Sequence, residues 1–272
     1  MKELSRKQLQ GIKHYFREKE LRRKAQEAKM HHRSPSGDGR RRESLARIIS
    51  EKVEHIVIVS SFILPPLKTG LIDRFLVMSA LEGIEPIIVL NKTDLLPHRA
   101  DGEKTLSLYR SLGYYGLLAS TVTCEGIDLL RDMLRGRSSM LAGHSGVGKS
   151  SLLNAMEPGI TDRPLVREVS SSTMKGTHTT TSVILYRFPD GTAIFDLPGL
   201  KLAPLHGVAP AEIGRCFPEF GYFVRRCRFN DCIHREEPEC GVREALEEGA
   251  ISKDRYESYL RMLGEITDRI LF

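Results

Sequence analysis

The sequence predicts an α/β fold in which helices cover both faces of a mostly parallel sheet, with a basic N-terminal arm and a small, mostly helical C-terminal module. From Val53 onward, short apolar runs rich in Ile and Val alternate with amphipathic stretches, which is typical of strands joined by crossover helices. Polar or glycine-rich residues follow several of these runs, where the carboxyl ends of parallel strands bind ligands. The expected boundaries are 1–50 for the arm, 51–204 for the α/β domain and 205–272 for the module.

Individual elements follow from the spacing of apolar residues. The run 53–62, VEHIVIVSSF, is predicted to be a strand because its apolar residues are nearly continuous. The run 71–84 is predicted to be an amphipathic helix that ends at a glycine. Further strands are expected over 87–90, 114–122, 140–142, 180–188 and 193–195, and further helices over 126–134, 151–156 and 242–271.

Composition favours a globular protein rather than a membrane protein. Hydrophobic residues make up 40% and charged residues 28% of the 272 residues, as in ordinary globular chains. No apolar run approaches the roughly 20 residues that span a bilayer. The N-terminus lacks the apolar core of a signal peptide. We therefore expect a cytoplasmic protein without a membrane partner.

Positive charge is concentrated in the arm. Residues 1–50 hold 15 Lys and Arg against 6 Asp and Glu, an excess of 15 − 6 = +9, whereas the whole chain carries only +6. Residues 1–30 fit a weakly amphipathic helix, and the run 31–42, HHRSPSGDGRRR, fits a flexible linker. Such an arm favours binding to a polyanion such as RNA, and the alternative is a solvated tail.

The strongest motif is a phosphate-binding loop. Residues 143–150, GHSGVGKS, fit the pattern G-x-x-x-x-G-K-[ST] between a predicted strand and a predicted helix. Backbone N–H groups of such a loop surround the phosphates, Lys149 would contact the β- and γ-phosphates, and Ser150 would ligate Mg²⁺. The residues predicted to bind the nucleotide here are Gly143, His144, Ser145, Gly146, Val147, Gly148, Lys149, Ser150 and Ser151.

A second motif selects the base. Asn91, Lys92 and Asp94 fit the pattern N-K-x-D directly after the strand 87–90. The aspartate of such a loop accepts two hydrogen bonds from guanine, and adenine offers neither donor at that place, so the combination with the phosphate loop indicates GTP. Ser120 and Thr121 end another predicted strand where related GTPases place Ser-Ala, whose backbone N–H binds the guanine carbonyl oxygen.

Two later segments are predicted to respond to the γ-phosphate. Asp196 and Gly199 fit the pattern D-x-x-G; Asp196 would hold Mg²⁺ through water and the Gly199 N–H would contact the γ-phosphate. The run 176–181, GTHTTT, can supply the threonine that completes the Mg²⁺ shell, and Thr180 is favoured before Thr179. A string of threonines before a strand also fits ordinary strand residues.

The residue after D-x-x-G is Leu200, where many GTPases carry a glutamine that orients the attacking water. Leucine forms no hydrogen bond through its side chain, so intrinsic hydrolysis is expected to be slow. His178 is the candidate for positioning the water because an imidazole can do that work. The alternative is a solvated histidine.

A metal site is predicted near the C-terminus. Three thiolates and one imidazole in one short segment suit a closed, tetrahedral, structural zinc site that would supply much of the local folding free energy. The predicted ligands are Cys227, Cys232, His234 and Cys240. The other two of the five cysteines, Cys124 and Cys216, are expected to be free thiols. Nearby arginines could meet RNA phosphates or form a solvated basic face: Arg225, Arg226, Arg228 and Arg235.

The order of the motifs is circularly permuted. The base-reading motif (91–94) precedes the phosphate loop (143–150), and the γ-phosphate-responsive segments come last. The chain resembles the ribosome small-subunit-dependent GTPase family (RsgA, also called YjeQ) in five segments: "GHSGVGKSSLLN", "GTHTTT", "DLPG", "NKTDLL" and "CRFNDCIHREEPECGV". The resemblance implies a circularly permuted P-loop GTPase domain, GTP hydrolysis stimulated by the small ribosomal subunit, rRNA contact and a role in late subunit maturation.

Two features depart from that family. Its members carry an N-terminal OB-fold that binds rRNA, whereas about fifty residues precede the GTPase domain here and are too few for that barrel. His144 stands where glutamine is often found. We expect a monomeric GTP hydrolase with one structural Zn²⁺ and with Mg²⁺ bound alongside GTP. Two alternatives remain: a permuted GTPase with a non-ribosomal partner, and a zinc-stabilised RNA-binding GTP switch with negligible turnover.

Overall fold

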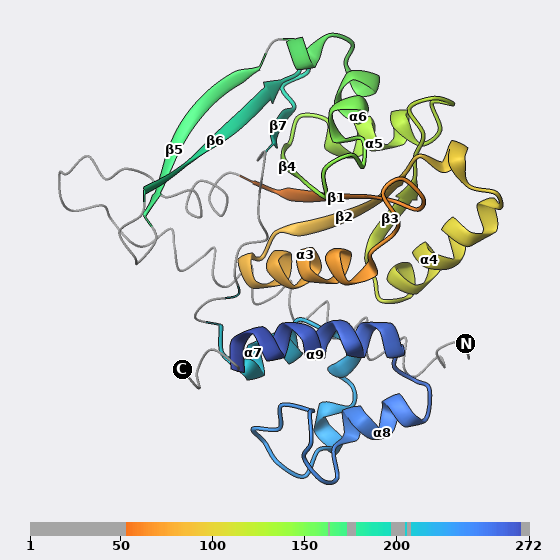
Figure 1. Cartoon of the computed structure of the whole chain (residues 1–272), viewed down its shortest axis with the longest axis vertical. Coiled ribbons are helices and arrows are strands. Elements are labelled where there is room, and N and C mark those ends of the chain that lie inside the picture. The colour runs from red at the N-terminus through yellow and green to blue at the C-terminus, as the bar shows by residue number, and fades with distance from the viewer. Residues whose placement is uncertain (1–52, 163, 173–177, 197–204, 206–207, 268–272) are drawn as a thin grey trace.

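The computed structural model describes residues 53–162, 164–172, 178–196, 205 and 208–267, and for 165–172 and 178–183 the backbone only. The basic arm, Gly199 and Leu200 lie outside the described residues. Figure 1 shows a twisted sheet with helices on both faces and a second group of helices below it. No helix in the described part of the chain combines the length and the apolar character needed to cross a membrane.

The sheet has seven strands in the order β3-β2-β1-β4-β7-β6-β5 within the described residues. The first five in this order run parallel, whereas β6 is antiparallel to both of its neighbours. The strands are β1 (His55–Ser61), β2 (Glu85–Asn91), β3 (Tyr115–Leu118), β4 (Ser138–Ala142), β5 (Leu165–Ser172), β6 (His178–Arg187) and β7 (Ala193–Asp196). The expected mixed α/β sheet is confirmed, and β5 is a strand that the sequence did not predict.

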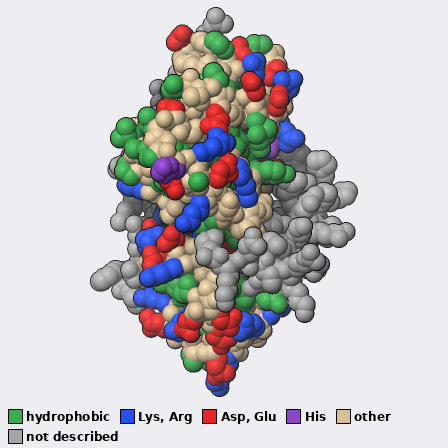
Figure 2. All heavy atoms as spheres, turned by 90° about the vertical axis from the view of Figure 1, so that its right-hand side faces the viewer, with side chains coloured by type: hydrophobic (Ala, Val, Ile, Leu, Met, Phe, Trp, Pro, Cys, Tyr) green, Lys and Arg blue, Asp and Glu red, His purple; other side chains and the backbone are tan. Residues whose placement is uncertain are grey.

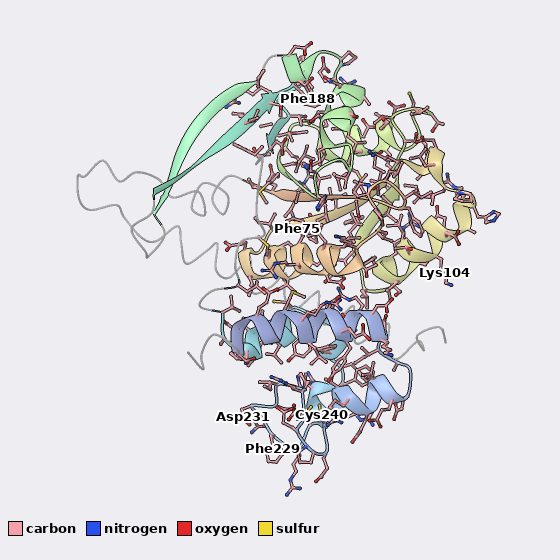
Figure 3. All side chains as sticks on the ribbon, in the orientation of Figure 1. Phe75, Lys104, Phe188, Phe229, Asp231 and Cys240 are labelled. Carbon is pink, nitrogen blue, oxygen red and sulfur yellow. The ribbon has the colours of Figure 1, made fainter. Side chains whose placement is uncertain are left out.

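Two hydrophobic layers cover the faces of the sheet. Helices α5 (Ile127–Leu134) and α6 (Lys149–Met156) pack on one face, where Val57 and Val59 of β1 point. Helices α3 (Thr69–Glu82) and α4 (Arg99–Ser111) pack on the other face against the alternate side chains of β1. Burial on both faces explains why β1 and β2 are nearly continuous apolar runs rich in Ile and Val. Figure 3 labels Phe75, which belongs to α3, and Phe188, which lies at the upper end of the sheet.

The C-terminal residues form a third hydrophobic cluster around aromatic side chains. Its elements are α7 (Pro210–Arg215), η3 (Pro218–Phe220), η4 (Val224–Arg226), α8 (Gly241–Glu247) and α9 (Lys253–Thr267). The helical tail predicted over 242–271 contains two helices in its described part, because the chain turns between α8 and α9. Gly249 has φ 72° there, a left-handed conformation that ends a helix.

Helix α3 is buried on two sides. Phe75 and Leu76 belong to the cluster beneath the sheet, whereas Val77 belongs to the C-terminal cluster. Figure 1 shows α9 running alongside α3 on the side away from the strands. The sequence predicted an amphipathic helix that ends at Gly83, and Gly83 is its C-cap in the left-handed conformation. The second buried face was not apparent, because a partner helix nearly two hundred residues later covers it.

A buried ionic network joins the two parts of the molecule at this contact. The Arg255 guanidinium on α9 is 2% exposed and lies 2.6 Å from Asp73 Oδ1 on α3 and 2.7 Å from Glu219 Oε1. The Tyr109 hydroxyl on α4 donates a hydrogen bond of 2.9 Å to the same Asp73 oxygen. Burial disfavours the charge of Arg255, but the two carboxylates outweigh it and keep its pKa above the usual value.

Candidate nucleotide site and metal centre

Four of the predicted motifs lie at one edge of the sheet. The phosphate loop follows β4, the N-K-x-D loop follows β2, Ser120 follows β3, and Asp196 is the last residue of β7. These strands run parallel and stand close together in the sheet order, so their carboxyl ends share an edge. The arrangement brings together residues that are far apart in the sequence.

The phosphate loop has the glycine conformations that its sequence predicts. Gly143 has φ 145°, and a Cβ there would lie 2.2 Å from the Val59 carbonyl oxygen. Gly148 has φ 95°, and a Cβ there would lie 2.4 Å from Asn91 Nδ2. Val147 between them is 2% exposed and anchors the loop in the core. Both glycine positions therefore exclude side chains, because the loop passes so close to β1 and to the N-K-x-D loop.

Polar groups of this loop remain accessible. Lys149 Nζ donates to the carbonyl oxygens of Gly143 at 3.0 Å and His144 at 3.3 Å, so the cation already lies over the loop. His144, Ser145 and Gly146 are exposed, as are the predicted ligands in the first turn of α6, Ser150 and Ser151. A cation, a helix N-terminus and backbone N–H groups together favour an anion here.

The predicted base-reading loop contacts the phosphate loop directly. Lys92 Nζ donates to the Gly146 carbonyl oxygen at 2.6 Å and to the Leu64 carbonyl oxygen at 2.5 Å. Asn91 Nδ2 donates to the Val147 carbonyl oxygen at 2.9 Å. The contacts span 54 and 56 residues of sequence, so the permuted order of the motifs leaves the site assembled.

Asp94 and Ser120 are joined by a hydrogen bond. The Ser120 hydroxyl donates to Asp94 Oδ1 at 2.5 Å and accepts from the backbone N–H groups of Val122 at 3.1 Å and Thr123 at 3.2 Å. Ser120 is fully buried, whereas Asp94 is exposed and so accessible to a ligand. Thr121 is half-buried beside it. The Ser120 side chain thus orients Asp94, a role beyond the backbone contact that the sequence suggested.

Of the two segments predicted to respond to the γ-phosphate, the structure describes Asp196 and residues 178–181. Asp196 is 8% exposed and pairs with Ile184 of β6. The backbone of His178 and Thr180 lies in β6 and pairs with β5. At these two positions the threonine-rich run is therefore a strand, as the alternative interpretation of its sequence predicted. Thr180 is four residues from Ile184 along β6, which is roughly 13 Å of strand. The structure therefore does not bring Thr180 or His178 to Asp196.

The predicted metal ligands form one cluster. The donor atoms of Cys227, Cys232, His234 and Cys240 all lie within 4.8 Å of one another. His234 Nδ1 is 3.6 Å from Cys227 Sγ and 3.5 Å from Cys240 Sγ, and these two sulfur atoms are 4.0 Å apart. Tetrahedral bonds to zinc separate two thiolates by about 3.8 Å and a thiolate from an imidazole nitrogen by about 3.6 Å. The donor set and its spacing fit a metal ion.

Burial sets the protonation of these ligands. It raises the pKa of the Cys232 thiol to about 12 and also raises that of Cys240. It lowers the pKa of His234, which keeps the imidazole neutral, as a metal ligand must be. A metal ion bound here would displace the thiol protons.

The loop that carries the ligands is held by side chains that the sequence analysis missed. The Glu237 carboxylate accepts from the backbone N–H groups of Ile233 at 2.7 Å and Arg235 at 2.8 Å. Tyr256 on α9 donates to the His234 carbonyl oxygen at 2.6 Å, and Tyr259 donates to that of Ile233. No sequence spacing gave a signal for these contacts, because each depends on the tertiary position of α9 or of the loop.

The arginines around the metal centre are mostly paired. Arg226 contacts Glu244 at 2.9 Å, Arg228 contacts Glu239 at 2.5 Å and Arg235 contacts Glu236 at 3.5 Å. Figure 2 shows acidic and basic side chains interleaved over the lower end of the molecule. This surface is therefore of mixed charge rather than uniformly basic.

Comparisons with known proteins agree with the arrangement at the sheet edge. The profile described as RsgA GTPase matches residues 33–205, which include both nucleotide motifs. A protein of Sodalis glossinidius named small ribosomal subunit biogenesis GTPase RsgA is 43% identical over 216 residues, covering 79% of this chain and 62% of the relative. A relative of the same name from Yersinia enterocolitica is 44% identical over 219 residues, with the same coverage. The chain thus spans 62% of the length of these curated relatives.

Solved structures share the fold. YjeQ from Thermotoga maritima is 36% identical with a TM-score of 0.64, covering 79% of this chain and 72% of that one. YloQ, described as a circularly permuted GTPase, is 32% identical with a TM-score of 0.62, covering 80% and 69%. The permuted order seen here, with the base-reading loop after β2 and the phosphate loop after β4, agrees with that description. The chain therefore belongs to the RsgA GTPase family.

Proposed function

We propose that this chain is a GTP hydrolase that acts in late maturation of the small ribosomal subunit, and that the subunit stimulates its turnover. The observation that carries the proposal is the direct contact between the base-reading and phosphate loops, in which Lys92 Nζ lies 2.6 Å from the Gly146 carbonyl oxygen. A ligand held by both loops must present a guanine at one end and phosphates at the other. The names of the curated relatives support the ribosomal part.

Guanine recognition falls to the N-K-x-D loop in this proposal. Asp94 accepts the two guanine hydrogen bonds, held in place by the Ser120 hydroxyl at 2.5 Å. Lys92 places its stem against the base, and Asn91 fixes the loop against the phosphate loop through the Val147 carbonyl oxygen. A backbone N–H at Thr121 contacts the guanine carbonyl oxygen. The residues of 143–151 hold the phosphates.

Hydrolysis would need Mg²⁺, whose charge offsets that of the β- and γ-phosphates. Ser150 and Asp196 supply oxygen donors, which this ion prefers. Thr180 and His178 would join them only if the start of β6 moved toward Asp196, since Thr180 lies roughly 13 Å and His178 roughly 20 Å of strand from Ile184, the residue that pairs with Asp196. In that arrangement Thr180 completes the metal shell, His178 orients the water, and the Gly199 N–H contacts the γ-phosphate.

The metal centre is proposed to hold one zinc ion in a structural role. Its four donors, Cys227, Cys232, His234 and Cys240, leave no coordination position for a substrate. The distances among Cys227 Sγ, His234 Nδ1 and Cys240 Sγ fit tetrahedral zinc. The module that it stabilises would dock on the ribosomal subunit and its rRNA. We propose a monomeric, cytoplasmic protein, with residues 1–50, 51–204 and 205–272 as its three parts.

Two measurements test this function. In the first, labelled GDP bound to the chain is challenged with GTP or ATP, and only GTP is expected to displace it at equal concentration. In the second, GTP turnover is measured alone, with small ribosomal subunits and with large ones, and the small subunits are expected to raise the rate about tenfold or more. Lys149→Ala is the inactive control.

The outcomes separate the parts of the proposal. Displacement by ATP as strong as by GTP would overturn guanine recognition. Guanine selectivity without any stimulation would contradict the ribosomal role and favour a different partner. Tight binding to the small subunit with turnover that stays negligible would instead indicate a binding switch.

A further inference from the structure

We propose that Glu125 is a positioning residue for guanine recognition, which clamps together the two loops that read the base. The inference rests on the proposed guanine site. The two loops are the first base loop, residues 91–94, and the second base loop, residues 120–125. Glu125 lies outside the N-K-x-D pattern, and no motif in the sequence points to it.

Glu125 contacts the first base loop through its carboxylate. The Thr93 hydroxyl donates to Glu125 Oε2 at 2.6 Å. The other oxygen, Oε1, forms an ion pair with Arg99 in the first turn of α4, the helix that follows the first base loop. The side chain of Glu125 is 27% exposed, so water only partly screens these contacts.

Glu125 contacts the second base loop through its backbone. Its carbonyl oxygen accepts from the Ser120 N–H at 3.0 Å, which closes the second base loop. Glu125, the last residue of the second base loop, therefore bonds to Thr93 of the first base loop and to Ser120, whose hydroxyl donates to Asp94. Thr93 is the immediate neighbour of Asp94 in the chain, so a shift of Thr93 would turn the Asp94 carboxylate.

The position of Glu125 is itself fixed by the turn that carries it. Cys124 has φ 60° and Gly126 has φ 70°, so left-handed residues flank it on both sides. A Cβ at Gly126 would lie 2.1 Å from the Leu118 carbonyl oxygen at the end of β3. The turn thus lies tightly against the sheet and begins α5, which makes it a rigid support for the clamp.

The consequence concerns the alignment of Asp94. A carboxylate that accepts two parallel hydrogen bonds from guanine must lie in the plane of the base, and Asp94 is exposed. The clamp supplies that alignment through Thr93 and Ser120. Loss of the Glu125 carboxylate releases Thr93 but keeps the backbone bond to Ser120. It is therefore expected to weaken recognition of the guanine edge, while leaving the phosphate contacts of Lys149 in place.

Glu125→Ala tests the inference through equilibrium affinities for GDP, IDP and ADP in the presence of Mg²⁺. IDP lacks the exocyclic amine and can give Asp94 only one of the two hydrogen bonds, so the ratio of GDP to IDP affinity measures the alignment. We expect GDP affinity to fall about tenfold, and IDP and ADP affinities to fall no more than about threefold. Glu125→Gln, which keeps an acceptor for Thr93, is expected to restore part of the ratio.

Glu103→Ala is the matched control. Glu103 lies on α4, 3.6 Å from Arg99, and accepts from Arg110 at 2.8 Å, but it contacts neither base loop. Its removal is expected to leave all three affinities within about twofold. Thr93→Val provides a second route if Glu125→Ala folds poorly. Its effect on the ratio should match that of Glu125→Ala, and the double variant should lose little more than either single one.

The results discriminate between the possible readings. Equal losses for GDP, IDP and ADP would overturn the inference, because they indicate general loosening of the site. An unchanged ratio in both Glu125→Ala and Thr93→Val would overturn it as well. If the wild-type chain itself fails to prefer GDP over ADP, the proposed guanine site has failed, and that result is visible before any variant is compared.

Discussion

The nucleotide edge and the metal centre are built by opposite means. At the nucleotide edge, the loops that follow β2, β3 and β4 meet because the strands beneath them are packed between two hydrophobic layers. The metal centre takes all four ligands from residues 227–240, in which the structure contains no helix or strand. A large core can thus hold a site open for a ligand that comes and goes. A loop with little regular structure depends on its ligand to keep its shape.

The two regions also differ in how their polar atoms are satisfied without a ligand. Lys92 and Lys149 already bond to carbonyl oxygens of the phosphate loop, so the edge is paired within itself. In the metal centre, Cys240 Sγ lies 3.5 Å from His234 Nδ1 and 4.0 Å from Cys227 Sγ, distances longer than those of strong hydrogen bonds. The comparison leads to the expectation that metal removal damages one region and leaves the other.

The largest effect is expected from that removal. Treatment with a chelator, or Cys232→Ser, should release about one metal ion per chain and open residues 208–267 to proteolysis, because structural zinc contributes roughly 10–16 kcal/mol to small zinc domains. GDP affinity should stay within about threefold, since the sheet holds the nucleotide edge. Metal analysis, limited proteolysis and GDP titration measure these quantities.

Cys124→Ser serves as the control for metal removal, because Cys124 is an exposed thiol outside the cluster. It should change neither the metal content nor the protease pattern. Protein purified without chelator that holds no metal would contradict the metal centre. A nucleotide edge that collapses together with the module would contradict the contrast between the two regions.

The next effect concerns the link between the regions. Arg255→Ala leaves the carboxylates of Asp73 and Glu219 buried without their partner, and breaking a buried pair in this way costs about 3–5 kcal/mol of unfolding free energy. Urea unfolding would measure the loss. Arg261→Ala removes a pair of the same helix whose arginine is 60% exposed, and should cost less than about 1 kcal/mol. Equal costs for the two variants would show that the buried network does not join the regions.

The smallest of the three effects on free energy lies at the base. Asp94→Asn should weaken GDP binding about 100-fold, since two charge-assisted hydrogen bonds lose about 3 kcal/mol together. The same variant should favour xanthosine diphosphate, because its amide can donate to the carbonyl of xanthine. Asp101→Asn, an exposed acidic change in the first turn of α4, is the control. GDP binding by Asp94→Asn within threefold of wild type would remove Asp94 from base recognition.

The parts of the molecule that could be predicted from the sequence are those that depend on residues close together along the chain. The phosphate loop at 143–150 and the ligands from Cys227 to Cys240 are recognisable because their chemistry fixes the spacing of residues along the chain. The strands before each nucleotide motif were equally clear, since burial on both faces makes them continuously apolar. Strand β5 and helix α4 were missed, the latter because its run from Arg99 is mostly polar.

What could not be predicted depends on contacts between distant segments. Nothing in the sequence near Glu125 points to Thr93, and nothing near Asp73 points to Arg255, because these pairs form only when the sheet and α9 are in place. The threonine-rich run was ambiguous for a different reason. Its β-branched residues fit both a strand and a ligand-binding loop, and the structure places the backbone of residues 178–181 in β6.

Helix α3 imposes a constraint of its own on the evolution of this chain. With the sheet against one side and α9 against the other, seven of its fourteen residues are buried, among them the charged residues Asp73 and Arg74. A substitution there cannot be absorbed by repacking a single layer. Sequence drift should therefore be slower along α3 than along α5, where only three of eight positions are buried.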